Sequence, residues 1–149
     1  MTTFEAQSLE LPEDREAITR ADLVFYGVDH STLSYEARVF FDNLKATEAT
    51  SQSAEEGYAG SFTVFGHAGC YGGADHCAPD QRYRDEFDRR PPHPLVPFTR
   101  TVTVTEAIQR VPGPSVEVTT VVVVREQKGI SNAPTVAAFE SVRLLVYQD

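Results

Sequence analysis

The strongest constraint on the fold is a β-branched run over residues 115–124, which reads SVEVTTVVVV and ends in four valines. Side chains branched at Cβ favour extended backbone and pack well on a pleated sheet. Shorter segments elsewhere alternate apolar and polar side chains or form compact apolar runs, which is typical of antiparallel strands with one buried face. These further predicted strands span 23–28, 35–41, 58–65, 99–105 and 139–147.

Six predicted strands without a repeating strand–helix alternation indicate an all-β protein. We expect an antiparallel β-sandwich or barrel of about six to seven strands, with one or two short helices. Pro12 followed by acidic residues predicts one or two helical turns over 12–20. A second short helix is predicted over 105–111, with Thr105 as its cap and Pro112 at its end.

The chain has 149 residues, which predicts a single domain over 1–149 with residues 1–20 as a polar N-terminal arm. One stretch breaks the strand pattern. Residues 66–98 have no periodicity, carry many charges and contain five prolines. Loops longer than about 15 residues are uncommon in compact domains and are often functional. We therefore expect the working surface to lie on this long 66–98 loop.

The net charge of −9 and the sequence pI near 4.8 argue against a nucleic acid or an anionic membrane surface as partner. No apolar run approaches the length of a membrane-spanning helix. The N-terminal segment is acidic, whereas a secretory signal would be basic and then apolar. These features predict an acidic, soluble, cytoplasmic protein, and export together with a partner remains an alternative.

The loop opens with GHAGCYGGADHC at 66–77, which holds both cysteines and two of the four histidines of the chain. Thiolate and imidazole ligands suit Cu(I) or Zn(II), so His67, Cys70, His76 and Cys77 are candidate metal ligands. His93 is a fifth candidate if the loop folds back on itself.

Two other interpretations of this segment stay open. The Cys-x6-Cys spacing matches no standard zinc motif, and Cys70 and Cys77 would form a disulfide if the compartment were oxidising. Gly72 and Gly73 would allow the tight turn that such a bridge needs. The third interpretation is a pair of free thiols without a special role.

Several short motifs occur in an order that resembles a known family. They are FYGV at 25–28, EARVFFD at 36–42, YAGSFTVFG at 58–66, EFDR at 86–89 and TEAI at 105–108. In this order the chain resembles the C-terminal β-sandwich of molluscan haemocyanins and the related C-terminal domains of tyrosinase-type copper proteins. The resemblance covers roughly residues 20–147.

In that family the β-domain packs over the dicopper site of a helical domain, and a bulky side chain blocks access of substrate. In some members, cysteines near this surface help to deliver copper. The four histidines of this chain, at 30, 67, 76 and 93, form no helical His-x-x-x-His pair, so the six-imidazole dicopper half is absent from the sequence.

The resemblance thus implies a free-standing, non-catalytic accessory or lid domain that shields a dicopper tyrosinase-like partner or assists its copper loading. Copper is the metal that it implies. The candidate blocking side chains lie on the long loop and are Tyr71, Tyr83, Phe87 and Leu95.

Two rival functions remain. The first is a small copper-dependent oxidoreductase that uses the 67–77 segment, and the second is a protein-binding β-domain whose long loop recognises another protein. His30 is expected to be a turn residue, because adjacent side chains in Asp29-His30-Ser31 point apart and make a catalytic triad unfavourable. Phe87, within a charged run, is expected to anchor the loop from below.

Overall fold

A computed structural model describes residues 2–67, 86, 87, 89, 95–124 and 139–148. The elements, in chain order, are β1 (Thr2–Glu10), β2 (Ile18–Val28), β3 (Tyr35–Phe41), the 3-10 turn η1 (Ala54–Glu56), β4 (Tyr58–Val64), β5 (Phe98–Thr103), α1 (Thr105–Arg110), β6 (Ser115–Val124) and β7 (Ser141–Gln148).

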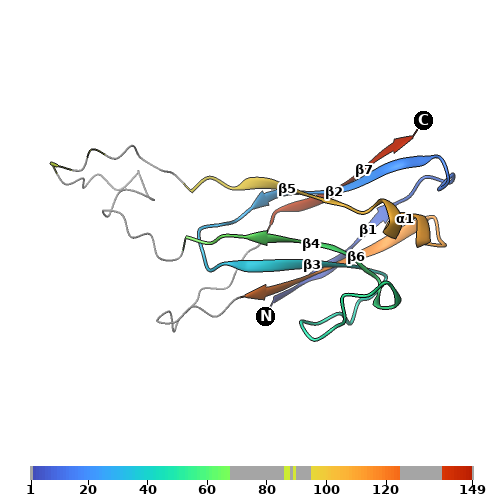
Figure 1. The fold of residues 1–149 in the computed structure, drawn as a ribbon, viewed down its shortest axis with the longest axis horizontal. Coiled ribbons are helices and arrows are strands. Elements are labelled where there is room, and N and C mark those ends of the chain that lie inside the picture. Colours follow the sequence, from blue (N-terminus) through green and yellow to red (C-terminus); the bar gives the residue numbers. More distant parts are fainter. Residues whose placement is uncertain (1, 68–85, 88, 90–94, 125–138, 149) are drawn as a thin grey trace.

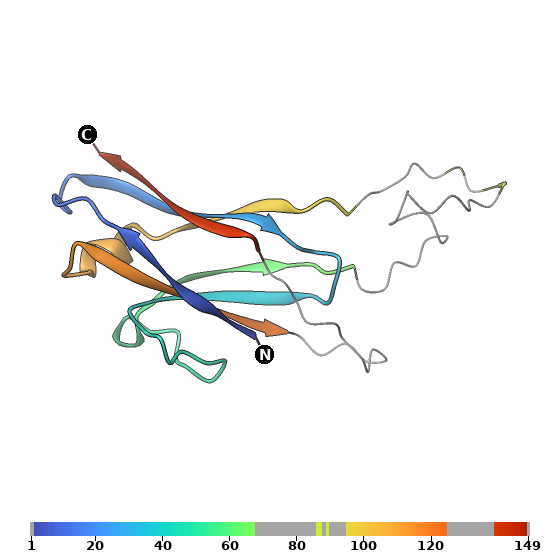
Figure 2. The same ribbon diagram turned by 180° about the vertical axis from the view of Figure 1, so that it is seen from behind.

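The seven strands of this described part form two antiparallel sheets, which confirms the predicted all-β sandwich (Figure 1). One sheet has the strand order β1-β6-β3-β4, and the other has the order β5-β2-β7. Seen from behind, the two sheets lie face to face with their strands running along the same long axis (Figure 2). β4 of the first sheet lies beside β5 of the second, and β1 lies beside β7.

The core lies between the two sheets, because alternate residues of each strand point inward. Phe25 of β2 is fully buried, and its ring lies 4.9 Å from that of Phe62 in β4 and 5.0 Å from that of Phe139 before β7. The buried residues around it are mostly aliphatic, among them Leu23, Val28, Ala37, Val39, Val64, Val104, Ile108, Val116 and Val122.

A second, smaller cluster lies outside the four-stranded sheet and is covered by the 43–57 segment. Phe40, Ala46 and Val121 are buried there, and Tyr58 packs against them. Simple alternation along 58–65 would put Tyr58 on the same face as Phe62. The register between β3 and β4 shifts at this point, so Tyr58 lies opposite Phe40 on the outer face. Such a bulge reverses the side to which a strand residue points.

The N-terminal region differs from the prediction. The first half of the expected polar arm contains strand β1, which pairs with β6 from Thr2↔Val122 to Glu10↔Ser115. The predicted helix over 12–20 is wrong, because residues 13–17 form a turn and β2 begins at Ile18. The carboxylate of Asp14 accepts the backbone N–H groups of Glu16 and Ala17, which favours a turn.

The predicted second helix is confirmed as α1, but Thr105 is not its cap. Val104 occupies the N-cap position without a side-chain cap bond, and Thr105 Oγ1 instead accepts the backbone N–H of Ala21 at 3.0 Å. The threonine therefore joins α1 to β2. Within the described residues, no helix has the length and apolar character needed to cross a membrane.

Candidate functional site

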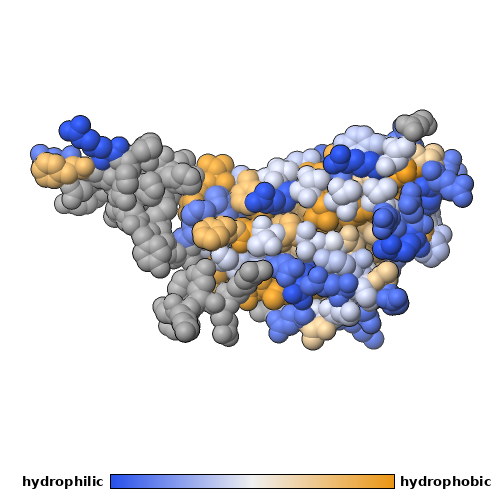
Figure 3. Space-filling view, in the orientation of Figure 1, coloured by the Kyte–Doolittle hydropathy of each residue, from blue (hydrophilic) through white to orange (hydrophobic). Residues whose placement is uncertain are grey.

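The ends of four strands meet at one end of the sandwich, which we call the loop-bearing end. β4 ends there at Val64, β5 begins at Phe98, β6 ends at Val124 and β7 begins at Ser141 (Figure 1). The predicted long loop connects β4 to β5, so both of its attachment points lie at this end. Apolar surface gathers here (Figure 3), where Phe65, just before the loop, and Val96, near its end, are 79% and 63% exposed.

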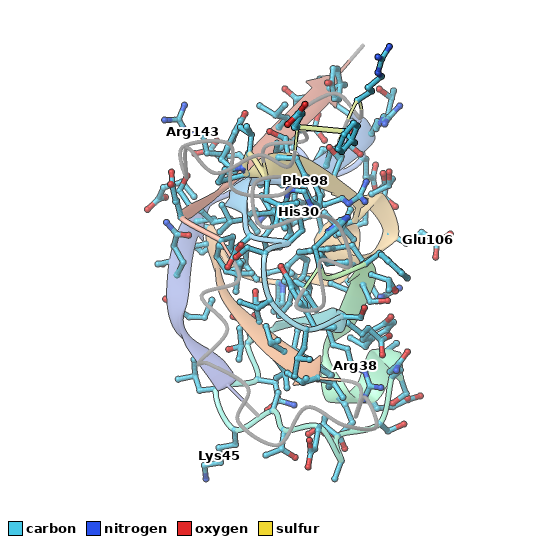
Figure 4. All side chains as sticks on the ribbon, turned by 90° about the vertical axis from the view of Figure 1, so that its left-hand side faces the viewer. His30, Arg38, Lys45, Phe98, Glu106 and Arg143 are labelled. Carbon is cyan, nitrogen blue, oxygen red and sulfur yellow. The ribbon has the colours of Figure 1, made fainter. Side chains whose placement is uncertain are left out.

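His30 lies at this end because the chain turns sharply after β2. Asp29 Oδ1 accepts the backbone N–H of Ser31 at 2.8 Å and its hydroxyl at 2.7 Å, which holds the turn. The ring of His30 packs edge-to-face on Phe98, with 4.9 Å between the ring centres. Figure 4 looks onto this end and shows His30 next to Phe98 near its centre.

His67 reaches the same place from the end of β4. Its backbone N–H donates to the carbonyl oxygen of His30 at 2.9 Å. Gly66, just before it, is buried against the backbone of Thr32 and Leu33, and its N–H donates to Ser34 Oγ at 3.0 Å. Only a residue without a side chain fits there, so Gly66 brings the following histidine onto the turn.

The two imidazoles form a pair. Their ring centres lie 5.1 Å apart with the ring planes at 88°. His30 Nε2 lies 2.9 Å from the carbonyl oxygen of Val96, and His67 Nδ1 lies 3.3 Å from that of His30. A carbonyl oxygen only accepts, so these two nitrogens are the donors, and the neutral form of each ring would then have its lone pair on His30 Nδ1 or His67 Nε2.

This arrangement makes the loop-bearing end a candidate for metal binding, because neutral imidazole lone pairs are common metal ligands. The ring of Phe98, which contacts His30, also lies beneath Arg100, whose guanidinium carbon is 4.5 Å from the ring centre. His30 and His67 are both partly buried. In the described part of the chain, no group of three or more His, Cys, Asp or Glu side chains could hold a metal ion.

The predicted ligand set is represented in the described residues by His67 alone. Cys70, His76, Cys77 and His93 lie outside these residues, and so does the proposed Cys70–Cys77 disulfide. The structure adds His30, which the sequence indicated only as a turn residue. The β3–β4 register explains its position, because the pair Tyr35↔Val64 places the chain before β3 next to the chain after β4.

Of the four candidate blocking residues, two lie in the described part of the chain and two do not. Tyr71 and Tyr83 lie outside the described residues, and Leu95 is partly buried. Phe87 is 82% exposed, so the expectation that it anchors the loop from below is wrong. Sequence composition could not settle this point, because an aromatic residue within a charged run is compatible with either side of a loop.

Below the imidazole pair, the buried Tyr35 donates its hydroxyl to the carbonyl oxygen of Asp29 at 2.8 Å. Burial raises the pKa of this phenol above its ordinary value; the Asp29 carboxylate raises it further, and Arg100 opposes the effect. The native chain thus holds the Tyr35 proton more tightly than the unfolded chain does.

We expect stability to fall at alkaline pH because of Tyr35. Below about pH 10 the phenol is protonated in both states, and above it the unfolded chain ionises first, which favours unfolding. Urea unfolding at about pH 8 and about pH 11 measures the loss, which should be smaller in Tyr35→Phe. Tyr147→Phe, at a half-exposed position, should behave like the parent chain. Equal losses in all three proteins would contradict the prediction.

Comparison with known proteins returns no match, since no family model, no curated protein and no solved structure matches this chain.

Proposed function

We propose that this chain is a non-catalytic accessory domain that acts as a lid on a dicopper tyrosinase-like partner and assists its copper loading. The starting point is the resemblance to the C-terminal β-sandwich of haemocyanins and tyrosinase-type copper proteins. The seven-stranded sandwich in the described part of the chain is compatible with the fold that this resemblance implies.

The observation that carries the proposal is the exposure of Phe87. Its ring is 82% exposed, and the short stretch 86–87 lies far beyond the strands at the loop-bearing end (Figure 1). Burying a phenylalanine side chain contributes about 1.5–3 kcal/mol, and aromatic anchors of this kind dominate many protein interfaces. Of the two candidate blocking groups in the described residues, Phe87 is exposed and Leu95 is partly buried, and we assign Phe87 to the partner's site.

The scaffold suits such a role. The described residues of the main core cluster belong to the strands, to α1 or to the short segments beside them. No described member of this cluster comes from 66–97. Within the described residues the core is therefore built by the strands, α1 and the segments beside them, which suits a scaffold that carries a loop for another molecule.

The second part of the proposal is that the loop carries a copper ion as cargo for the partner. Thiolate and imidazole ligands suit Cu(I), and His67, Cys70, His76, Cys77 and His93 are the proposed carriers. In this proposal the loop holds the ion only until the partner takes it, and the oxygen chemistry belongs to the partner.

The test uses a dicopper tyrosinase-like protein from the same genome and measures catechol oxidation with and without this chain. We expect the parent chain to bind and inhibit the loaded partner. Phe87→Ala should weaken inhibition at least tenfold, because the ring that closes the site is lost. Leu44→Ala is the matched control, since Leu44 is an exposed apolar residue, at 63%, on a different loop.

Two results would overturn the proposal. One is the absence of any complex with the partner. The other is catechol turnover by the copper-loaded chain alone, which would favour a small copper-dependent oxidoreductase instead.

A further inference from the structure

We propose that His30 and His67 are two ligands of one site for a divalent transition-metal ion of the Cu²⁺ or Zn²⁺ class. The site shares His67 with the proposed copper cargo, but it needs neither cysteine and no partner protein. His30 comes from the turn after β2 and His67 from the end of β4, so the tertiary fold brings them together.

The separation of the rings fits one shared ion. A metal–nitrogen distance of about 2.0–2.1 Å places two imidazole ring centres about 5 Å apart when the ligands meet at a near-tetrahedral angle. The ring centres of His30 and His67 are 5.1 Å apart. A linear arrangement of two ligands would need a larger separation, so the pair favours ions that take four or more ligands.

The hydrogen bonds from the two imidazole rings to backbone carbonyls also fit a metal site. Metal-binding histidines usually donate their second ring N–H to a carboxylate or a backbone carbonyl, which orients the ring and fixes its tautomer. His30 donates from Nε2 to Val96, and His67 donates from Nδ1 to the carbonyl of His30. Each ring thus uses one nitrogen for a backbone carbonyl, so His30 Nδ1 and His67 Nε2 are the atoms that would ligate the ion.

The pair is held before any ion binds, which reduces the entropic cost of forming the site. The Asp29 turn and the Phe98 ring fix His30, and the backbone bond from His67 to His30 fixes the second ligand. The net charge of −9 also favours cations over anions near this protein. Water molecules or further donors would complete the coordination of the ion.

The test is a titration of the full chain with Cu²⁺ or Zn²⁺ in a buffer that does not bind metal. A Cys70→Ser/Cys77→Ser background removes the thiols, so that any remaining affinity reports imidazoles. We expect one ion per chain in this background. His30→Phe retains an aromatic ring against Phe98 but removes the ligand, and it should lower the affinity at least tenfold, as should His67→Phe.

Ser31→Ala is the matched control, because Ser31 is an exposed residue of the same turn, and its affinity should equal that of the background. With Cu²⁺, the paramagnetic resonance spectrum should show coupling to two imidazole nitrogens, and one set should vanish in His30→Phe. Thermal melting without metal reports whether each variant folds.

A measurement on the unaltered chain tests the proposal even if the variants fail to fold. Zn²⁺ should shift the imidazole NMR signals of both His30 and His67. The proposal is overturned if the thiol-free chain binds no ion, if His30→Phe binds as tightly as its background, or if the His30 signals do not move. None of these results depends on the partner, so the lid proposal would stand or fall separately.

Discussion

Replacing Phe25 by alanine is expected to lower the free energy of unfolding by about 3–5 kcal/mol, a large part of the stability of a domain of this size. Phe25 is fully buried and contacts Phe62 and Phe139, so its ring links β2, β4 and the segment before β7. Its removal leaves a cavity between the two sheets that the surrounding strands can only partly fill. Urea unfolding followed by circular dichroism measures the loss.

Phe65→Ala is the matched control for this substitution. Phe65 has the same side chain at the end of β4, but it is 79% exposed, so the change should stay within about 0.5 kcal/mol. If the two variants lost equal stability, the packing of Phe25 between the sheets would be refuted.

Gly66→Ala is expected to have the second largest effect, because it acts on folding and on the imidazole pair together. A Cβ atom at Gly66 would lie 2.1 Å from the carbonyl oxygen of Thr32 and 2.3 Å from the carbonyl carbon of Leu33. Both are backbone atoms and cannot rotate away. We expect a loss of about 1–3 kcal/mol or more from this overpacking, measured by urea unfolding.

The same displacement moves His67 away from His30, since the two are joined through the backbone N–H of His67. Metal affinity in the thiol-free chain should therefore fall at least tenfold in Gly66→Ala, even where the variant still folds. Gly113→Ala is the control, because the nearest atom to its added Cβ lies 3.6 Å away. Wild-type stability and affinity in Gly66→Ala would show that the turn before β3 yields to the added methyl group.

Local sequence predicted the strands well wherever one face is apolar. The predicted segments 35–41 and 115–124 match β3 and β6, and 58–65 matches β4 to within one residue. Alternation reports burial directly in such strands, because successive side chains point to opposite faces. The prediction failed for β1, whose residues Gln7, Ser8 and Glu10 are polar and whose place depends on pairing with β6.

The candidate site was less predictable than the fold. The sequence indicated a metal site from the local density of cysteine and histidine at 66–77, and of those residues only His67 lies in the described part of the chain. His30 lies 37 positions earlier and shows no motif with it. The 42–57 connection between β3 and β4 is too long to set a hairpin register by itself, so the meeting of these two histidines could not be derived from the sequence.

The sequence by itself determined the all-β class, because hydrophobic alternation is a local property that each strand carries alone. The tertiary structure decided which strands pair, which side of a bulge Tyr58 occupies, and which imidazoles meet. These outcomes depend on contacts between distant segments. These long-range contacts contribute free energy only when the two sheets pack, and no local sequence pattern predicts them.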